Sequence, residues 1–315
     1  MNIGIDIGGT NIGAGLVDKD LKIVYRLEIP TNKEKGYAFV RDNIISIIEK
    51  MILKADKEDK NIESIGIGIP GIADKKGDNI IYCTNLNWEN VPLGKELRRR
   101  FDIEINIEND ASLAGIAENI LGMSRGYESS VFITIGTGLG GGIILNNKLY
   151  TGPHGIASEI GHMIVGENFY DCNCGNNGCL ESFASSTAME KYIKRMIQEG
   201  YKDTILLEKV KNLKYIDTRL IFESAKEGDG LSNLAVDRMV KYLTIGIVNL
   251  INVIDPEIIL IGGGVARAGD FILDKINNLL PEYILFKEVG YGKVQLAKLE
   301  NDAGIIGAAL LNKYK

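Results

Sequence analysis

Residues 5–24 read IDIGGTNIGAGLVDKDLKIV, and residues 133–150 read ITIGTGLGGGIILNNKLY. Each stretch combines an apolar strand, a turn of glycine and threonine, a glycine-rich strand, a polar turn and a further strand. Chance likeness between glycine-rich hairpins is one explanation. The alternative is a chain with two related β-hairpins, each presenting its Gly/Thr turn to a common cleft. We call residues 6–11 the first Gly/Thr turn and residues 136–140 the second.

The rest of the chain alternates strand and helix patterns, which is typical of an α/β protein. Asn146-Asn147 is a plausible hairpin turn, because both residues tolerate a positive φ. Apolar residues recur at helical spacing in several segments and form short runs in others. Helices are predicted at about 37–53, 111–121, 186–199, 217–227, 231–254 and 270–280 and from 303 onward, and further strands at 64–71, 104–108 and 257–264.

Composition narrows the possible functions. The chain has 315 residues, of which 45% are hydrophobic and 25% charged, and a formal net charge of −6. Lysine and arginine are scattered, which argues against nucleic acid as a partner. The N-terminus resembles no secretory signal, and the longest apolar run, near 245–254, falls short of a membrane span. We therefore expect a cytoplasmic enzyme of two lobes.

Two segments match G-x-G-x-x-G, one starting at Gly66 and the other at Gly136. A dinucleotide-binding loop leaves a strand and opens a helix. Neither segment is followed by a helical pattern, and the P-loop motif does not occur in the sequence. Both motifs are therefore interpreted as something other than a dinucleotide fingerprint.

The two Gly/Thr turns favour phosphate binding. Glycine allows the backbone to approach an anion, while N–H groups and a threonine hydroxyl donate to phosphate oxygens. Asp6 ends an apolar strand beside the first turn, where a carboxylate suits Mg²⁺. Two tight hairpins with a solvent-facing Asp6 would give the same pattern, and that alternative stays open at this point.

Cysteine and histidine concentrate in one segment, EIGHMIVGENFYDCNCGNNGCLE at 159–181, which we call the metal segment. It holds three of the four cysteines and one of the two histidines. Three thiolates and an imidazole satisfy tetrahedral Zn²⁺ and leave no open position for water, so the predicted zinc is structural. A redox pair is disfavoured because no C-x-x-C occurs, and exposed thiols are the remaining alternative. The predicted ligands are His162, Cys172, Cys174 and Cys179.

Seven motifs in order resemble the ROK family (repressor, open reading frame, kinase) of the actin-like ATPase superfamily: DIGGTNIGAGLVD, GIGIPG, INIENDA, ITIGTGLGGGIIL, EIGHM, CNCGNNGCLES and EIILIGGGVA. The resemblance implies an α/β, two-lobed actin-like ATPase (ribonuclease H-like) fold, each lobe a mixed β-sheet flanked by helices. The small lobe would comprise 1–115, completed by a C-terminal helix at 302–315. The large lobe would comprise 116–301 and include the metal segment.

The resemblance also implies roles for individual residues. ATP would contact both Gly/Thr turns and a glycine run near the nucleoside, through Asp6, Gly8, Gly9, Thr10, Asn11, Thr137, Gly138, Gly262, Gly263 and Gly264. The sugar would contact Asn85, Asn109, Asp110, Glu159, His162 and Glu181. Zinc would then hold Glu159, His162 and Glu181 in place, so that its removal should abolish activity without directly affecting the two turns.

Asn109-Asp110 lies between a predicted strand and a predicted helix, where helix capping is the simplest interpretation. The sequence lacks the Glu or Gln that would complete a capping box after Asp110. Phosphoryl transfer to an alcohol needs a carboxylate that accepts the hydroxyl proton. The ROK resemblance assigns that role to Asp110 and sugar binding to Asn109.

The expected function is ATP-dependent phosphorylation of a free hexose, with glucose favoured by the likeness of the metal segment to the glucokinase branch. N-acetylmannosamine, fructose, mannose and allose are alternatives, as is polyphosphate as the phosphate donor. A sugar-binding transcriptional regulator that lacks its DNA-binding domain is the alternative from another class. We disfavour it because the first strand begins at residue 2 and leaves no room for a helix-turn-helix. The family also suggests a homodimer.

Overall fold

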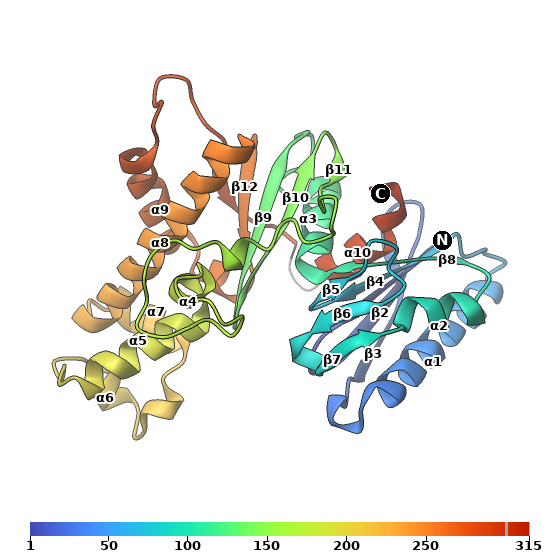
Figure 1. Ribbon diagram of the computed structural model, residues 1–315, viewed down its shortest axis with the longest axis horizontal. Coiled ribbons are helices and arrows are strands. Elements are labelled where there is room, and N and C mark those ends of the chain that lie inside the picture. The colour runs from blue at the N-terminus through green and yellow to red at the C-terminus, as the bar shows by residue number, and fades with distance from the viewer. Residues whose placement is uncertain (300–301, 315) are drawn as a thin grey trace. The chain divides into compact units, whose positions relative to one another are not determined.

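The computed structural model of this chain describes residues 1–299 and 302–314 (Figure 1). Its contacts divide into two compact units. Unit 1 comprises 1–132, 142–158 and 298–315, and unit 2 comprises 133–141 and 159–297. The lobe boundaries suggested by family resemblance stay predictions. Of the residues in those lobes, 300, 301 and 315 lie outside the described part.

Unit 1 is built on a mixed five-stranded sheet of order β3-β2-β1-β4-β8. Its strands are β1 (Asn2–Ile7), β2 (Asn11–Val17), β3 (Ile23–Pro30), β4 (Ser64–Ile69) and β8 (Glu104–Asn109). A small sheet adds β5 (Ile72–Ala73), β6 (Ile80–Cys83) and β7 (Trp88–Val91). The helices are α1 (Tyr37–Asp56), α2 (Leu93–Arg100), α3 (Asp110–Leu121) and α10 (Ala303–Ala309).

One face of the unit 1 sheet carries isoleucines and packs against α1. Alternation along β1 and β4 places Ile3, Ile5, Ile65 and Ile67 in the same buried cluster as the apolar side of α1. That side comprises Val40, Ile44, Ile47, Ile48, Met51 and Ala55, all buried. Each fully buried isoleucine contributes about 1.5–3 kcal/mol to folding. The helical spacing in the sequence therefore predicted α1 correctly, to within three residues at its C-terminal end.

The opposite face carries glycines and receives α10 (Figure 1). A Cβ at Gly4 would overlap the carbonyl oxygen of Ile305, and one at Gly66 would overlap that of Ala308. Any side chain at these positions would push α10 off the sheet. The G-x-G at 66–68 is thus a packing motif within a strand, which confirms that it is not a dinucleotide fingerprint.

The second sheet repeats the first in topology. Its order is β11-β10-β9-β12-β13, so β9 and its hairpin partners β10 and β11 correspond to β1, β2 and β3. β10 pairs antiparallel with β11, and β12 pairs parallel with β13. The likeness between the two sequence stretches therefore reflects a repeated arrangement. The strands are β9 (Ser130–Ile135), β10 (Leu139–Leu145), β11 (Lys148–Leu149), β12 (Ile258–Gly262) and β13 (Lys293–Leu296).

The helices of unit 2 are those that the sequence periodicity predicted, with two short additions. They are α4 (Glu181–Ala184), α5 (Ser186–Gln198), α6 (Leu206–Lys209), α7 (Thr218–Lys226), α8 (Gly230–Ile254) and α9 (Asp270–Tyr283). Asn146 and Asn147 form the predicted hairpin turn, with φ of 53° and 60°. The β5–β6–β7 sheet was missed, because strands of two to four residues leave too short an alternation to detect.

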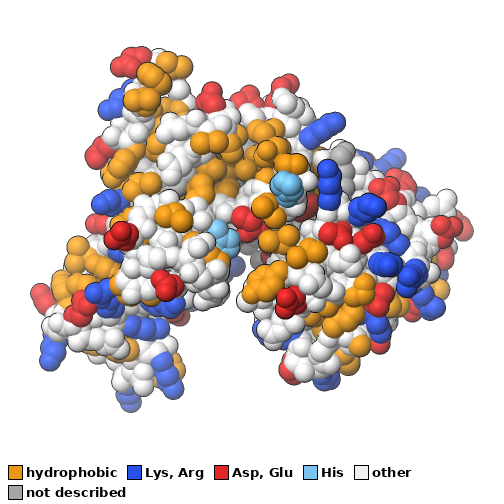
Figure 2. All heavy atoms as spheres, viewed as in Figure 1, with side chains coloured by type: hydrophobic (Ala, Val, Ile, Leu, Met, Phe, Trp, Pro, Cys, Tyr) orange, Lys and Arg blue, Asp and Glu red, His pale blue; other side chains and the backbone are white. Residues whose placement is uncertain are grey.

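Two surface properties bear on partners. Basic and acidic side chains are interspersed on the face seen in Figure 2. Among the described residues, none of the helices combines the length and apolar character that crossing a membrane requires.

Candidate active site

The first Gly/Thr turn and Asp110 leave the unit 1 sheet at the same edge. β1, β4 and β8 run parallel, with Asp6 paired to Gly68 and Gly68 paired to Glu108. The carboxyl ends of parallel strands meet at one edge of a sheet, where ligands commonly bind. The structure therefore brings together, within unit 1, two segments that the sequence separates by about a hundred residues.

Thr31, directly after β3, holds the first Gly/Thr turn. Its N–H donates to Thr10 O at 2.7 Å and its hydroxyl to Gly8 O at 2.7 Å. The turn is closed by Gly8 N–H donating to Asn11 O at 2.8 Å. In a trans peptide the C=O and the next N–H point in opposite directions, so the N–H of Gly9 points away from Thr31. The side-chain amide of Asn11 donates to Glu28 at 2.7 Å, so this residue shapes the turn through its backbone.

Lys33 follows Thr31 and lies beside the turn. It belongs to a short 3-10 helix, η1 (Lys33–Lys35), and its Nζ donates to Asn85 O at 2.9 Å. A Cβ on Gly9 would lie 4.0 Å from Lys33 Nζ and 3.8 Å from Asn85 Cβ. The predicted sugar contact Asn85 therefore lies against the first Gly/Thr turn. Sequence reasoning missed Thr31 and Lys33, because neither belongs to a motif and their partners are remote in the chain.

Asp6 is a partly buried carboxylate between small residues. Burial raises the pKa of its carboxyl, because the charged form loses hydration. A Cβ on Gly68 would lie 3.5 Å from Oδ1, and one on Gly304 would lie 2.5 Å from Oδ2. Glycine at 304 leaves space for the carboxylate, and Asp6 thus offers an oxygen ligand near the end of β1.

Asn109 caps α3, and Asp110 is its first residue. Asn109 Oδ1 accepts from the N–H groups of Ala111 at 2.9 Å and Ser112 at 3.3 Å. Its Nδ2 donates to Gly71 O at 3.2 Å. Capping is therefore a real function of Asn109, in addition to any contact with a ligand. The Asp110 carboxylate lies at the positive end of the α3 dipole and accepts from Ala111 N–H at 2.8 Å.

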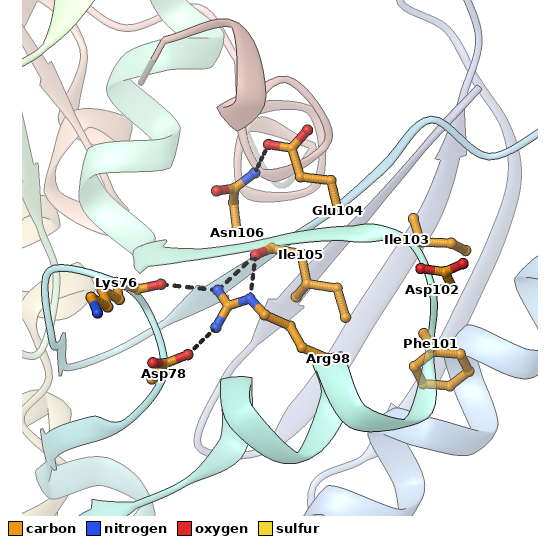
Figure 3. A pocket seen from close by; sticks show the side chains of 9 residues that line it. All are labelled: Lys76, Asp78, Arg98, Phe101, Asp102, Ile103, Glu104, Ile105 and Asn106. Carbon is orange, nitrogen blue, oxygen red and sulfur yellow. Dashed lines mark hydrogen bonds and ion pairs between the residues drawn. The ribbon is translucent and has the colours of Figure 1, made fainter.

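A polar pocket of about 610 Å³ lies beside β8, with Arg98 pointing into it (Figure 3). All five N–H groups of Arg98 donate to protein oxygens: Ile105 O twice, Gly77 O, Lys76 O and the Asp78 carboxylate. Arg98 thus fastens the β5–β6 turn to the strand that leads to Asp110. We interpret this pocket as a structural joint.

The second Gly/Thr turn is held by the start of α5 in unit 2. Gly136 N–H donates to Gly138 O at 2.9 Å, and Ser186 N–H donates to Gly136 O at 2.8 Å. The hydroxyl of Thr187 donates to Thr137 O at 2.8 Å. Backbone oxygens again face the supporting element, as they do in the first turn.

The predicted glycine run lies next to this turn. Gly263 has φ of 81°, and a Cβ there would lie 2.5 Å from Ile135 O, directly before Gly136. Gly264 lines a cavity of about 430 Å³ within unit 2. The other residues that line it are Ser186, Thr218, Arg219, Phe222, Glu223, Lys226, Arg267 and Ala268. The structure therefore places Gly262–Gly264 and the second turn together, next to a space of ligand size.

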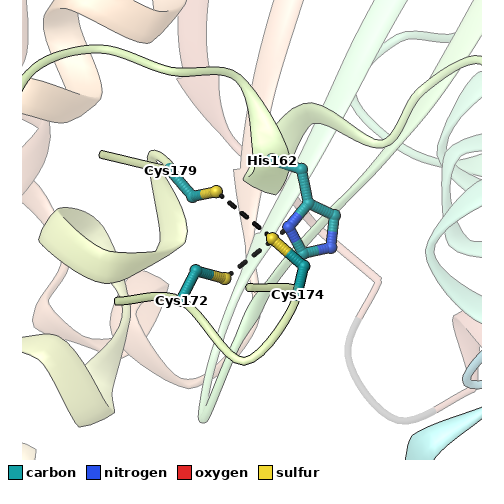
Figure 4. A group of neighbouring side chains, drawn as sticks. All are labelled: His162, Cys172, Cys174 and Cys179. Carbon is teal, nitrogen blue, oxygen red and sulfur yellow. Dashed lines mark hydrogen bonds between the residues drawn. The ribbon is translucent and has the colours of Figure 1, made fainter. Parts of the chain in front are cut away.

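The four predicted metal ligands form one cluster in unit 2 (Figure 4). The ligand atoms of His162, Cys172, Cys174 and Cys179 all lie within 4.8 Å of one another. Cys172 Sγ is 3.7 Å from His162 Nδ1, and Cys174 Sγ is 3.6 Å from Cys179 Sγ. The four residues thus converge on one point in the described part of the chain.

The two glutamates of the metal segment lie next to the cluster. Glu159 Oε2 is 3.9 Å from His162 Nε2, the ring nitrogen that faces away from Cys172. The pKa of Glu159 is raised, mainly because the carboxyl is buried. Glu181 adds to this increase, and His162 partly offsets it. Glu181 Oε2 accepts from Leu139 N–H at 2.9 Å, directly after Gly138. The sequence predicted that removal of zinc would not directly affect the two Gly/Thr turns. This hydrogen bond instead connects the metal segment directly to the second turn.

Two sheets of the same strand order, each bearing a Gly/Thr turn and flanked by helices, define the actin-like ATPase fold. A ROK glucokinase from Streptomyces griseus, solved with glucose and AMPPNP, superposes with a TM-score of 0.81 at 32% identity, covering 98% of each chain.

The chain belongs to the ROK family, whose sequence model matches residues 2–315. Glucokinase from Thermotoga maritima is 36% identical over 99% of this chain and 97% of its own length. The xylose repressor of Caldicellulosiruptor bescii is 32% identical over 97% of this chain and 76% of the repressor.

Proposed function

We propose that this protein transfers the γ-phosphoryl group of ATP to the 6-hydroxyl of glucose. The broader assignment as an ATP-dependent hexose kinase, without a named sugar, rests on similarity to glucokinases over nearly the whole chain. The observation that supports it most directly is the shared sheet edge in unit 1. There Asp110 follows β8 and the first Gly/Thr turn follows β1, two strands that both pair with β4.

Asp110 is the proposed general base. As the sugar oxygen bonds to the γ-phosphorus, the bond from phosphorus to the β–γ bridging oxygen breaks, and ADP leaves with the electron pair. The hydroxyl proton passes to the Asp110 carboxylate. Asn109 would donate its second amide hydrogen to a neighbouring sugar hydroxyl while it caps α3. Asn85 would contact the sugar from beside Gly9.

The proposed ATP contacts come from both units. In unit 1, the backbone N–H of Gly9 and the Thr10 hydroxyl would donate to phosphate oxygens, with Gly8 and Asn11 shaping the turn. In unit 2, Thr137 and Gly138 would do the same. Gly262, Gly263 and Gly264 would line the nucleoside position next to the cavity of about 430 Å³. The sugar contacts of unit 2 would be Glu159, His162 and Glu181.

The residues fit both metals of the proposal. In tetrahedral Zn²⁺ sites with bonds of about 2.0–2.3 Å, neighbouring ligand atoms lie about 3.6–3.8 Å apart, and the cluster has pairs at 3.7 and 3.6 Å. His162, Cys172, Cys174 and Cys179 would hold the zinc. Asp6 would serve Mg²⁺ directly or through water, since a carboxylate oxygen is the kind of ligand that Mg²⁺ takes in proteins. When bound, Mg²⁺ neutralises phosphate charge and zinc fixes the shape of the metal segment.

A coupled ADP-release assay with Mg-ATP tests the proposal. The panel contains glucose, mannose, fructose, allose and N-acetylmannosamine, and polyphosphate is compared with ATP as the donor. We expect glucose to give the highest kcat/KM and Asp110→Asn to give almost none. If no hexose stimulates ADP formation in the wild type, the kinase proposal is wrong. If another sugar leads the panel, the glucose assignment is wrong.

A sugar-responsive regulator is the second candidate, because the similarity to a xylose repressor is nearly as extensive along this chain. It predicts xylose binding without ADP formation, which calorimetry and the coupled assay detect. We further propose a homodimer in the cytoplasm, which light scattering and cell fractionation test.

A further inference from the structure

Arg238 of α8 lies inside a cluster of aromatic rings in unit 2. Its guanidinium carbon is 4.6 Å from the ring centre of Phe183, 5.1 Å from that of Tyr192 and 5.4 Å from that of Tyr242. Phe183 and Tyr242 stack on each other with centroids 3.8 Å apart. The attraction between a cation and the faces of aromatic rings is strongest where water is excluded. Burial lowers the pKa of Arg238. The guanidinium is therefore a partly desolvated charge.

The hydrogen bond of Arg238 goes to the metal segment. Its Nη2 donates to Asn168 Oδ1 at 2.8 Å, 70 residues away in the sequence. Hydrogen bonds from a charged donor contribute about twice as much as neutral ones, and more so in a buried setting. The position of the Asn168 side chain thus depends on the charge of Arg238 as well as on packing.

Asn168 passes this constraint to the residue that follows Glu181. Its Nδ2 donates to Ser182 O at 2.6 Å and to Ser182 Oγ at 3.1 Å. The Ser182 hydroxyl in turn donates to Cys179 O at 2.7 Å. One hydrogen-bonded chain therefore runs from Arg238 to the backbone of a predicted metal ligand and to the residue next to a predicted sugar ligand.

Asn168 is also held from the opposite side of the loop. Its backbone N–H donates to Asn177 Oδ1 at 2.8 Å, and Asn177 Nδ2 donates back to Asn168 O at 3.0 Å. The hydroxyl of Tyr170 donates to Ser182 O at 2.7 Å. These hydrogen bonds of Asn168, Asn177 and Tyr170 thus hold residues 168–182 in a compact loop without using the four predicted metal-ligating side chains.

We propose that Arg238 is a positioning residue that docks residues 168–182 onto α8 and thereby sets Glu181 for sugar binding. The proposal rests on the proposed function for the identity of the ligand. The sugar-binding segment is then anchored twice, by the metal at its cysteines and by Arg238 at Asn168. Loss of the Arg238 anchor therefore weakens sugar binding and also weakens metal binding, because the hydrogen-bonded chain joins the two anchors.

The test compares Arg238→Met, Asn168→Ala and a matched control, Arg195→Met. Methionine keeps much of the apolar contact and removes the charge and the hydrogen bond. Arg195 also stacks on Phe169, at 4.4 Å, but its Nε donates to Glu199 at 2.6 Å. It therefore controls for the loss of an arginine from the aromatic cluster without loss of the bond to Asn168.

We expect Arg238→Met and Asn168→Ala to raise the hexose KM about 10- to 100-fold, the range typical of residues that orient ligands indirectly. The ATP KM should rise by a smaller factor, and Zn²⁺ affinity in a chelator competition should fall at least tenfold. Arg238→Lys should recover part of both effects. Arg195→Met should match the wild type in each measurement.

Amide hydrogen exchange of the purified full-length protein, with its metal retained, separates this proposal from the proposed function. Residues 168–182 should exchange faster in Arg238→Met than in the wild type, whether or not the protein phosphorylates a hexose. Unchanged exchange in this loop would overturn the anchor. A fall in Tm of Arg238→Met with unchanged hexose KM and Zn²⁺ affinity would also overturn it, since that pattern marks a purely structural arginine.

Discussion

Glu181 Oε2 accepts a hydrogen bond from the backbone N–H of Leu139 at 2.9 Å. Its other oxygen lies 3.9 Å from Cys172 Sγ. A Cβ on Gly138 would lie 2.5 Å from Glu181 Oε2, so this glycine makes room for the carboxylate. Within unit 2, one carboxylate therefore connects the metal segment with the second Gly/Thr turn, and the two predicted ligand contacts are not independent.

Glu181→Ala should raise both the hexose KM and the ATP KM. The hexose loses a carboxylate partner, and the second turn loses a hydrogen bond to a charged group, for which about 1.5–3 kcal/mol, or 10- to 100-fold, is typical. Glu181→Gln keeps an acceptor for Leu139 N–H and should affect mainly the hexose KM. Initial rates with each substrate varied distinguish the two variants. Equal ATP KM values in Glu181→Ala and the wild type would contradict the connection.

Asp110→Asn should reduce kcat by about 10²- to 10⁴-fold, the usual contribution of a general base. Asparagine has nearly the same shape and keeps an acceptor for Ala111 N–H, so we expect an unchanged Tm. Single-turnover kinetics and a thermal melt measure the two effects. The control is Asp102→Asn, at an exposed carboxylate before β8. A kcat within threefold of the wild type would remove Asp110 from this role.

Cys174→Ala, or extraction of zinc with a chelator, should lower hexose phosphorylation at least 100-fold and reduce the bound zinc measured by elemental analysis. Cys174 is exposed, so its replacement opens no core cavity. Because Glu181 contacts Leu139, we also expect weaker AMPPNP binding by calorimetry. Cys83→Ala is the control, since Cys83 is buried outside the cluster and its Sγ donates to Pro70 O. Full activity of zinc-free protein would disprove the structural role of zinc.

Local patterns predicted what depends on neighbours in the sequence. The spacing of apolar residues in α1, the positive φ values at Asn146-Asn147 and the order of the metal ligands each reflect short-range geometry. Contacts between distant segments were not predictable. Gly66 is a glycine because Ala308 packs against it, and only the folded sheet brings these two together.

The candidate site also contains contacts between distant segments that local sequence patterns did not predict. The residue types of the metal segment indicated a metal ligand set, but Arg238 and Thr31 belong to no motif and act through partners elsewhere in the chain. Asn109 illustrates a choice that the sequence left open. Its side chain caps α3. Capping a helix and contacting a ligand do not exclude each other, so one residue can combine both roles.

Lys33→Met should weaken ATP binding by about 3- to 10-fold and lower the salt dependence of the ATP KM. The ammonium group lies near Gly9 of the first Gly/Thr turn, and partly exposed charges act over a few ångströms with modest energies. Lys35→Met is a matched control on the same 3-10 helix, because Lys35 lies over the Phe39 ring at 4.5 Å instead. Equal ATP KM values for the two variants would show that Lys33 only supports Asn85.

Asp229, the N-cap of α8, provides a test of stability against pH. Burial alone would raise the pKa of its carboxyl, but hydrogen bonds from Ser232, Ile205 and Thr204 outweigh burial, so the pKa is lowered from its ordinary value of 3.8. A lowered folded-state pKa means that this stabilisation is complete above the unfolded-state pKa and is lost as the pH falls through the folded-state value.

Asp229→Asn should therefore cost about 1–3 kcal/mol of unfolding free energy at pH 7, because an amide presents a donor to surrounding donors. The difference from the wild type should shrink at pH 3 and below, which urea titrations at several pH values measure. Asp217→Asn is the control at the N-cap of α7, where the side chain accepts from Leu220 N–H and asparagine caps about as well. A cost that stays the same from pH 7 to pH 2 would show that packing, rather than the charge of Asp229, stabilises the start of α8.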